Sequence, residues 1–177
     1  QTVAVIGGRG KMGRCMARLF TDLGHIVMIS DLDTQLTPEE AAAAADVVVI
    51  SVPIDTTVDI IRRVGPKVRD DGLIMDVTSV KTAPLKAMLD ACSANVVGAH
   101  PLFGPSVHSL QGQRVVLCPG RGDAWLKWVR QTFESRGLVV MEASPEDHDR
   151  IMSVVQVLVH FSTEVMGRTL TRLGVSI

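Results

Sequence analysis

One histidine, His100, stands where its ring could act as an acid or a base. It follows the apolar residues VVGA and directly precedes Pro101 in the stretch VVGAHPLFGP. Proline moves the residue before it out of the α region, so we expect His100 to be extended, at the end of a strand. An imidazole with an ordinary pKa of about 6.5 can take a hydroxyl proton at neutral pH. The alternative is a strand-end histidine that is satisfied by backbone carbonyls.

A hydroxyl and an amine follow another apolar run, in the stretch LIMDVTSVK. The carboxyl ends of parallel strands meet at one edge of a sheet, so we expect Ser79 and Lys81 to lie near His100. Ser79 would then hold a substrate hydroxyl or the imidazole by a hydrogen bond. Lys81 would neutralise an anionic substrate, or be an ordinary exposed lysine at the start of a helix.

The other four histidines are weaker candidates. His25 follows a helix-ending glycine and is expected to be a cap or a surface residue, whereas His108 could line the pocket. His148 and His160 are twelve residues apart in a predicted helix, which places them roughly 120° apart around its axis. They share no face, so we expect no two-histidine metal site and no metal. We expect His160 to be buried at a domain junction.

A glycine motif directly follows the first predicted strand, in VAVIGGRGKMG. Its spacing is Gly8-x-Gly10-x-x-Gly13, at the start of a helix, which is typical of a dinucleotide site. Gly8 would make the tight turn, Gly10 would admit a pyrophosphate, and Gly13 would let the helix pack closely. Lys11 and Met12 would offer backbone N–H groups to the phosphates. The alternative is a glycine-rich turn without a nucleotide.

A carboxylate at the end of the second predicted strand indicates which dinucleotide binds. Asp31 lies 18 residues beyond Gly13, where it could accept both ribose hydroxyls and would repel a 2′-phosphate. The next residues include no arginine, so we predict NAD rather than NADP. Asp33 is the alternative ribose partner, and Arg9 could reach the adenine side of the site.

Four more residues are predicted to contact the cofactor at the same edge. Val52, Pro53 and Ile54 follow the apolar run VVVIS, and Pro53 would end that strand and leave backbone groups free. Thr78, beside Ser79, completes the predicted cofactor site.

An alternation of strands and helices must position these residues. Short β-branched runs predict strands, and the segments between most of them predict helices. This alternation predicts an α/β fold with a doubly wound, mostly parallel sheet, that is, a Rossmann-type domain. The strands are expected at residues 2–6, 26–30, 47–52, 73–77, 95–99, 114–118 and 138–142, and the helices at 11–23, 38–45, 55–64, 82–91 and 123–136.

The pattern changes at Ser144-Pro145-Glu146-Asp147, which predicts a long helix to about residue 172. Its stretch IMSVVQVLVHF is apolar nearly all round, so it needs burial on more than one side. The sheet could cover one face, and the rest needs a second subunit or a continuation of the chain. We therefore predict a nucleotide-binding domain at 1–143 and the start of a helical domain at 144–177.

The composition excludes several other classes of protein. Eighteen basic and nineteen acidic residues, six aromatic residues and no tyrosine argue against a nucleic-acid surface. No apolar run is long enough to cross a membrane. Three scattered cysteines, Cys15, Cys92 and Cys118, predict a reduced, cytoplasmic protein without disulfides or zinc. The first residue, a glutamine, and the end just after a helical pattern suggest a piece of a longer chain.

Five stretches together resemble the prephenate dehydrogenases: VIGGRGKMG, VVVISVPI, DVTSVKTAPL, GAHPLFGPS and EDHDRIMSVVQVLVHF. The resemblance is greatest to the dehydrogenase part of the bacterial enzymes that also carry chorismate mutase. It implies NAD-dependent oxidative decarboxylation of prephenate to 4-hydroxyphenylpyruvate in tyrosine biosynthesis, or oxidation of arogenate in some members. By resemblance, His100 would draw off the ring hydroxyl proton, and Ser79 would hold that hydroxyl and His100 in register.

The resemblance also implies a homodimer through the C-terminal helical region. The family's arginine that binds a substrate carboxylate is expected to lie beyond this chain. Some members carry a second histidine where this chain has Val157. Two alternatives are kept: another dehydrogenase with the same glycine loop, such as a β-hydroxyacid dehydrogenase or a pyrroline-carboxylate-type reductase, or a non-catalytic NAD-binding domain.

Overall fold

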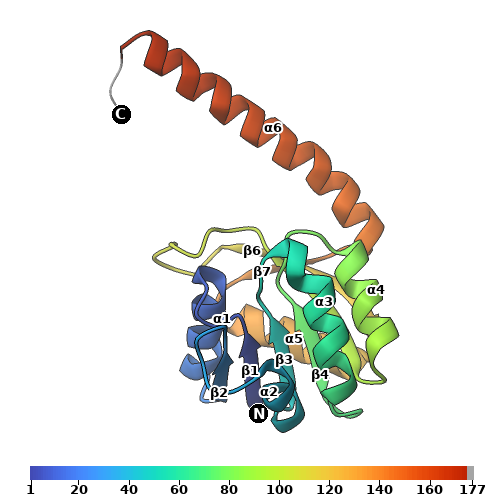
Figure 1. Cartoon of the computed structure of the whole chain (residues 1–177). Coiled ribbons are helices and arrows are strands. Elements are labelled where there is room, and N and C mark those ends of the chain that lie inside the picture. Colours follow the sequence, from blue (N-terminus) through green and yellow to red (C-terminus); the bar gives the residue numbers. More distant parts are fainter. Residues whose placement is uncertain (175–177) are drawn as a thin grey trace.

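The β-branched runs form one seven-stranded sheet in a computed structural model that describes residues 1–174 (Figure 1). The strand order is β2-β1-β3-β4-β5-β6-β7. The first five strands are parallel, β6 is antiparallel to β5, and β7 is parallel to β6. The predicted mostly parallel sheet is confirmed, with strands β1 (Thr2–Ile6), β2 (Ile26–Ser30), β3 (Val47–Ile50), β4 (Leu73–Asp76), β5 (Asn95–Pro101), β6 (Arg114–Arg121) and β7 (Val139–Glu142).

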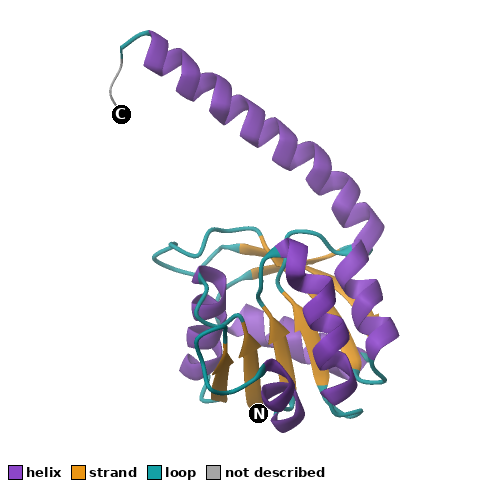
Figure 2. Cartoon of the chain, viewed as in Figure 1, coloured by secondary structure: helices purple, strands orange, loops and turns teal. Residues whose placement is uncertain are grey.

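Helices cover both faces of the sheet, as a doubly wound fold requires (Figure 2). One face packs against α1 (Lys11–Asp22) and α5 (Asp123–Ser135). The other face packs against α2 (Pro38–Ala44), α3 (Ile54–Val64) and α4 (Thr82–Ala91), with a short 3₁₀ turn at Gly65–Lys67 after α3.

Alternating side chains along each strand supply the two cores. In β1, Val3 and Val5 join the core beneath α1 and α5, whereas Ala4 and Ile6 join the core beneath α2, α3 and α4. All four are buried, which explains why this strand reads as continuously apolar. The sheet is therefore a rigid platform, and its carboxyl edge is where loops are free to form a site.

The strand that carries His100 is longer than predicted. The sequence predicted that it ends at residue 99, but β5 continues through His100 to Pro101, which pairs with Val115 of β6. Its pairing with β4, by contrast, ends at Gly98 opposite Asp76. His100 thus extends beyond the end of β4, at the carboxyl edge of the sheet.

The long helix α6 (Pro145–Arg172) begins as predicted, where the Ser144 hydroxyl accepts a hydrogen bond of 3.1 Å from the Asp147 backbone N–H. The expectation that the sheet covers one face of this helix is wrong, because the helix projects away from the domain (Figure 1). Its only buried residue is His148, in the first turn. Residues 175–177 of the predicted helical domain lie outside the described residues. Within the described part, no helix is long and apolar enough to span a membrane.

Candidate active site

The glycine loop folds as the motif predicts, with one change in which glycine makes the turn. Gly7 has the positive φ, +79°, and a Cβ there would lie 2.4 Å from the Ser51 carbonyl oxygen. The tight turn therefore belongs to Gly7 and not to Gly8. At Gly8 the constraint is packing, since a Cβ would lie 2.7 Å from Cγ2 of Ile29 on β2.

The start of α1 is open for an anion. Gly10 is the N-cap and provides no side-chain cap, so the first N–H groups of the helix, at Lys11 and Met12, have no acceptor within the helix. A Cβ on Gly13 would lie 2.2 Å from the Gly7 carbonyl oxygen. Only glycine allows this approach of helix to loop, and the resulting cradle fits a dinucleotide pyrophosphate.

The predicted ribose partner lies beside that cradle. One oxygen of the half-buried Asp31 accepts a 2.8 Å hydrogen bond from the Arg9 backbone N–H, and the other accepts one of 2.8 Å from Leu32. Each carboxylate oxygen keeps a lone pair for a ribose hydroxyl. The Arg9 guanidinium reaches the same side, as predicted, and there it forms an ion pair with Asp33.

A cavity of about 290 Å³ continues from Asp31 between β1, β2 and α3. Its position suits the adenosine half of a dinucleotide. Pro53 and Ile54 are exposed at the start of α3, beyond the carboxyl end of β3. The cavity is lined by residues that include Ile6, Gly7, Ser30, Asp31, Val52 and Ile60.

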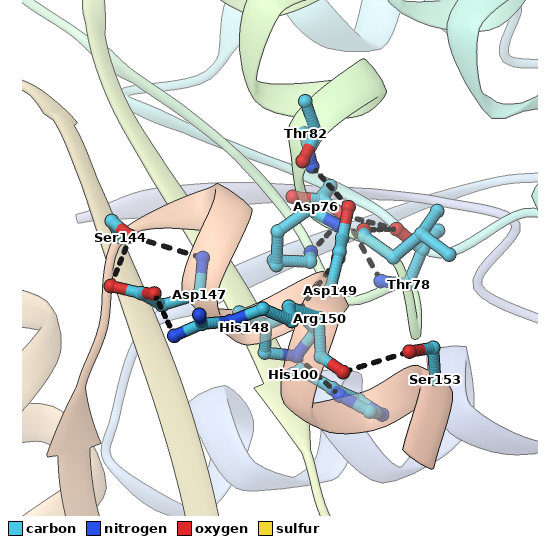
Figure 3. A network of polar contacts seen from close by, with 12 residues as sticks. Asp76, Thr78, Thr82, His100, Ser144, Asp147, His148, Asp149, Arg150 and Ser153 are labelled. Carbon is cyan, nitrogen blue, oxygen red and sulfur yellow. Dashed lines mark hydrogen bonds and ion pairs between the residues drawn. The ribbon is translucent and has the colours of Figure 1, made fainter.

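His100 lies on the α4 side of the sheet, beneath the first turn of α6 (Figure 3). Its Nδ1 is 2.8 Å from Nε2 of His148, and the two rings meet edge to face at 73°. His100 is buried, with only 7% of the residue exposed. The predicted strand-end position is confirmed, but the partner of the ring is a second imidazole.

The second imidazole is held in turn by a carboxylate. Nδ1 of His148 is 2.8 Å from Oδ1 of Asp149. The same carboxylate accepts hydrogen bonds from the backbone N–H groups of Lys81 (2.7 Å) and Thr82 (2.9 Å), at the start of α4. Helix α4 has no side-chain cap of its own, so Asp149 caps it from α6 and joins the two helices.

The second ring nitrogen of His100, Nε2, is free. Among the described residues, only Oδ1 of Asp76 is a buried side-chain polar atom without a hydrogen-bond partner. Nε2 of His100 makes no hydrogen bond in that part of the chain either, so it must keep contact with solvent. The ring therefore presents Nδ1 to His148 and keeps Nε2 in contact with solvent.

Both expectations for Lys81 are wrong, because its side chain is fully buried. Its ammonium forms an ion pair with Asp76 and donates a 2.8 Å hydrogen bond to the Ala99 carbonyl. A Cβ on Gly98 would lie 3.2 Å from Cδ of Lys81, so the lysine side chain packs closely over this glycine of β5. Because Asp76 is buried as well, the two residues form a structural ion pair. The bond from Lys81 to Ala99 fixes β5 just before His100.

Thr78 and Ser79 lie between this pair and the sheet edge. The Thr78 hydroxyl is turned inward, because it contacts the Asp76 carboxylate and lies 3.0 Å from the Val80 carbonyl oxygen. Ser79 is half-buried. Its hydroxyl makes no hydrogen bond within residues 1–174, to His100 or elsewhere, so its predicted role as a substrate contact stays a prediction.

The remaining histidines are dispersed. His160 is exposed on α6, so the prediction of a buried histidine is wrong, because α6 leaves the domain before that residue. His25 is half-buried near Trp128, with ring centroids 5.6 Å apart. His108 is exposed and lines a cavity of about 590 Å³ between α1 and the segment 105–111.

The surroundings of His100 keep its ring neutral. Burial lowers the pKa of His100 to about 4; the neighbouring His148 and Lys81 also lower it, and Asp149 raises it. For Asp149, partial burial raises the pKa, but the hydrogen bonds from Thr82, His148 and Lys81 outweigh it and lower the pKa to about 2. At neutral pH the site thus combines a neutral His100 with an ionised Asp149.

Sequence reasoning missed the pair His148–Asp149. Adjacent histidine and aspartate in the first turn of a helix, in EDHD, were a visible signal. Their contact with His100 spans 48 residues of sequence, and local patterns do not show which strand end a helix start will meet.

Comparison with known proteins connects this site to one family. Residues 25–142 match the family described as "Prephenate dehydrogenase, nucleotide-binding domain". The T-protein of Haemophilus influenzae is 35% identical over 170 residues, covering 96% of this chain and 45% of that protein. The probable arogenate/prephenate dehydrogenase of Methanocaldococcus jannaschii is 36% identical over 195 residues, covering 99% of this chain and 44% of that protein.

A solved structure of similar fold carries ligands. Prephenate dehydrogenase from Aquifex aeolicus, in complex with hydroxyphenyl propionate and NAD⁺, has a TM-score of 0.77 and is 25% identical. The match covers 97% of this chain and 70% of that chain. The two sequence relatives are longer proteins, and this chain spans less than half the length of each.

Proposed function

The chain belongs to the prephenate dehydrogenase family, whose nucleotide-binding domain it contains, and from this premise we propose that the protein oxidises prephenate with NAD. The observation that carries the proposal is His100, a neutral imidazole with a solvent-accessible Nε2. It lies at the carboxyl edge of the sheet, the edge at which the glycine loop follows β1. Such a ring is a hydroxyl base at the edge where α/β proteins bind their ligands.

The residues that would hold NAD follow from the geometry of the loop. The backbone at Gly8, Gly10 and the start of α1 would bind the pyrophosphate, and Asp31 would accept the adenosine ribose hydroxyls. β1 and β5 lie three strand spacings apart, roughly 14 Å, so an extended dinucleotide along the edge would bring its far end toward β5. NAD, when bound, supplies the hydride acceptor.

His100 would act on the ring hydroxyl at C4 of the substrate. Nε2 takes the hydroxyl proton as the C4 hydrogen leaves with its electron pair, and the Ser79 hydroxyl would hold the same oxygen in place. His100 thereby lets C4 become a ketone, which draws the electrons of the bond to the ring carboxylate. Carbon dioxide then leaves and the ring becomes a phenol, so the product is 4-hydroxyphenylpyruvate.

Part of the proposal concerns the organisation of the whole protein. We place a nucleotide-binding domain at 1–143, a helical domain beginning at 144, and a homodimer formed through that second domain. In support, the family match ends at residue 142 and α6 projects from the sheet with apolar side chains exposed along its length.

The test is NADH production by the full-length protein from prephenate and from arogenate, in wild type and in His100→Asn. We expect turnover of prephenate, with kcat about 10²- to 10⁴-fold lower in the variant and NAD affinity unchanged. Faster turnover of arogenate would reassign the substrate. Wild-type turnover of neither compound, with NAD bound, would favour a non-catalytic domain, and near-normal turnover by the variant would remove His100 from the reaction.

A further inference from the structure

The strand end and the helix start form a line of three groups: His100 on β5, then His148 and Asp149 on α6 (Figure 3). From the geometry we infer that His148 and Asp149 are positioning residues that fix the tautomer of His100 with its proton on Nδ1, so that Nε2 is a bare acceptor toward substrate. The inference rests on the proposed function of His100 as a base.

The direction of the hydrogen bonds follows from the end of the line. The carboxylate of Asp149 is ionised at neutral pH and can only accept, so the proton between it and His148 belongs to Nδ1 of His148. When this is the only ring proton of His148, its Nε2 is bare and must accept. The partner nitrogen, Nδ1 of His100, lies 2.8 Å away and must therefore donate.

The tautomer decides what the free nitrogen can do. A neutral His100 with its proton on Nδ1 has a lone pair on Nε2, and that is the nitrogen that keeps contact with solvent. The opposite tautomer would present an N–H group at the sheet edge and could not take the hydroxyl proton. Fixing the tautomer of a catalytic histidine through its other nitrogen is the role of aspartate in serine protease triads.

The anchoring of Asp149 makes this arrangement rigid. Its two oxygens also accept the backbone N–H groups of Lys81 and Thr82, so the carboxylate cannot turn away from His148 without uncapping α4. His148 itself is 2% exposed. The line is thus fixed at both ends, by a helix start and by a strand.

Charge supports the same reading once His100 has taken a proton. The titratable groups that act on the ring are His148 and Asp149 on α6 and Lys81 at the start of α4. Lys81 is itself paired with Asp76 on β4. Of the groups that shift the pKa of His100, only Asp149 raises it, whereas His148 and Lys81 lower it. Asp149 is therefore the group that stabilises the imidazolium, through the intervening ring.

The first test reads the tautomer directly and needs no turnover. In a two-bond ¹⁵N–¹H correlation spectrum of the histidine-labelled full-length protein at about pH 8, neutral His100 should carry its proton on Nδ1. The signals are assigned by their loss in His100→Asn. A proton on Nε2 of neutral His100 would overturn the inference.

The second test compares two substitutions of His148, one that keeps a hydrogen-bond acceptor and one that removes it. His148→Gln keeps an amide oxygen that can accept from Nδ1 of His100, whereas His148→Phe fills the space without an acceptor. We expect kcat within about 10-fold of wild type for Gln and a loss of about 10²-fold for Phe. Because Phe removes the acceptor but not the packing, equal losses in the two variants would overturn the inference.

The controls separate this inference from the proposed function. NAD affinity checks that each variant is folded, and His25→Gln, just before the edge strand β2, should leave kcat unchanged. In Asp149→Asn the acid limb of the pH profile of kcat should move to lower pH, because the group that raises the pKa of His100 is lost. An acid limb that does not move would contradict the role of Asp149. If the wild type oxidises no substrate, the proposed function fails, while the tautomer spectrum still decides the inference.

Discussion

At the residue scale, the proposed choice of cofactor depends on two carboxylates that have different tasks. Asp31 would offer its oxygens to the ribose, whereas Asp33 holds the guanidinium of Arg9 in an ion pair. Both pair members are exposed, and Arg9 follows Gly8 in the glycine loop. The arginine that could bind a 2′-phosphate is thus present but occupied, which the sequence alone could only raise as a possibility.

We expect Asp31→Ser to weaken NAD at least about 10-fold, because two hydrogen bonds to a charged group are lost, and to weaken NADP much less. Asp33→Ser should do the opposite, improving NADP because it frees Arg9 and removes a negative charge. Dissociation constants for both dinucleotides measure this, with Asp90→Ser on α4 as the control. Equal losses for the two dinucleotides in Asp31→Ser would remove this residue from the ribose site.

His100 also makes stability depend on pH. Its pKa is lowered from 6.5 to about 4 by burial first, so between these values the unfolded chain binds a proton that the folded chain does not. The free energy of unfolding therefore falls as the pH falls through this window.

From about pH 6.5 to 4.5 we expect the wild type to lose roughly 2 kcal/mol more stability than His100→Asn. Urea unfolding at the two pH values provides the difference, and the remaining titrating groups are common to both proteins. A variant that loses as much stability as the wild type would mean that His100 titrates normally in the folded protein.

At the element scale, the buried pair of Lys81 and Asp76 ties β4, α4 and β5 together just below the site. Removing one charge leaves the other buried without a counter-ion, so Lys81→Met should cost about 3–5 kcal/mol. The matched control is Lys86→Met, which breaks the exposed pair with Asp90 on the same helix and should change stability by less than about 0.5 kcal/mol.

The same pair provides a double-mutant test. Lys81→Met combined with Asp76→Leu should cost less than the sum of the single changes, because the apolar pair has no uncompensated charge. Strict additivity of the two unfolding free energies would show that the two side chains do not interact in the folded protein.

The order and type of the elements were readable because they depend on local patterns. Continuous apolar runs predicted the buried strands, and Ser144-Pro145 marked the start of α6. The close packing at Gly13 also followed from the motif. The turn glycine was misassigned because the sequence offers two adjacent glycines, Gly7 and Gly8, and only the backbone conformation distinguishes them.

Tertiary contacts were the part that the sequence could not provide. Lys81 looked like a surface residue because it stands at the start of a helix, and its contacts with Asp76 on β4 and the Ala99 carbonyl on β5 are tertiary. His148 looked isolated because its partners are a neighbour along the chain and a strand end 48 residues away. In each case the deciding contact joins elements whose relative placement is not encoded in a local repeat.

At the scale of the whole molecule, α6 leaves many apolar side chains in water. Phe161 is 66% exposed and Leu158 is 59% exposed, and a contiguous apolar surface of this kind is typical of an interface between chains. The others along the helix are Ile151, Val154, Val155, Val157, Val159, Val165 and Met166.

We expect the protein to be a dimer by sedimentation velocity at micromolar concentration, and Phe161→Asp with Leu158→Asp to shift it toward monomer. Charge placed in an apolar interface is desolvated without a partner, which weakens association. The control is Leu32→Asp, which changes a fully exposed apolar residue in the loop after β2, far along the chain from α6. A wild type that stays monomeric at high concentration would contradict the interface.

The first turn of α6 supplies groups that lie against the last residues of β5, although the two segments fall on opposite sides of the proposed boundary at 143. Joining a foreign helical region to this sheet at that point would preserve the whole nucleotide cradle yet leave its histidine with no neighbour to orient it. A working chimera, whether made by recombination or by design, has to bring the opening turn of the helix with the sheet rather than with the rest of the helix.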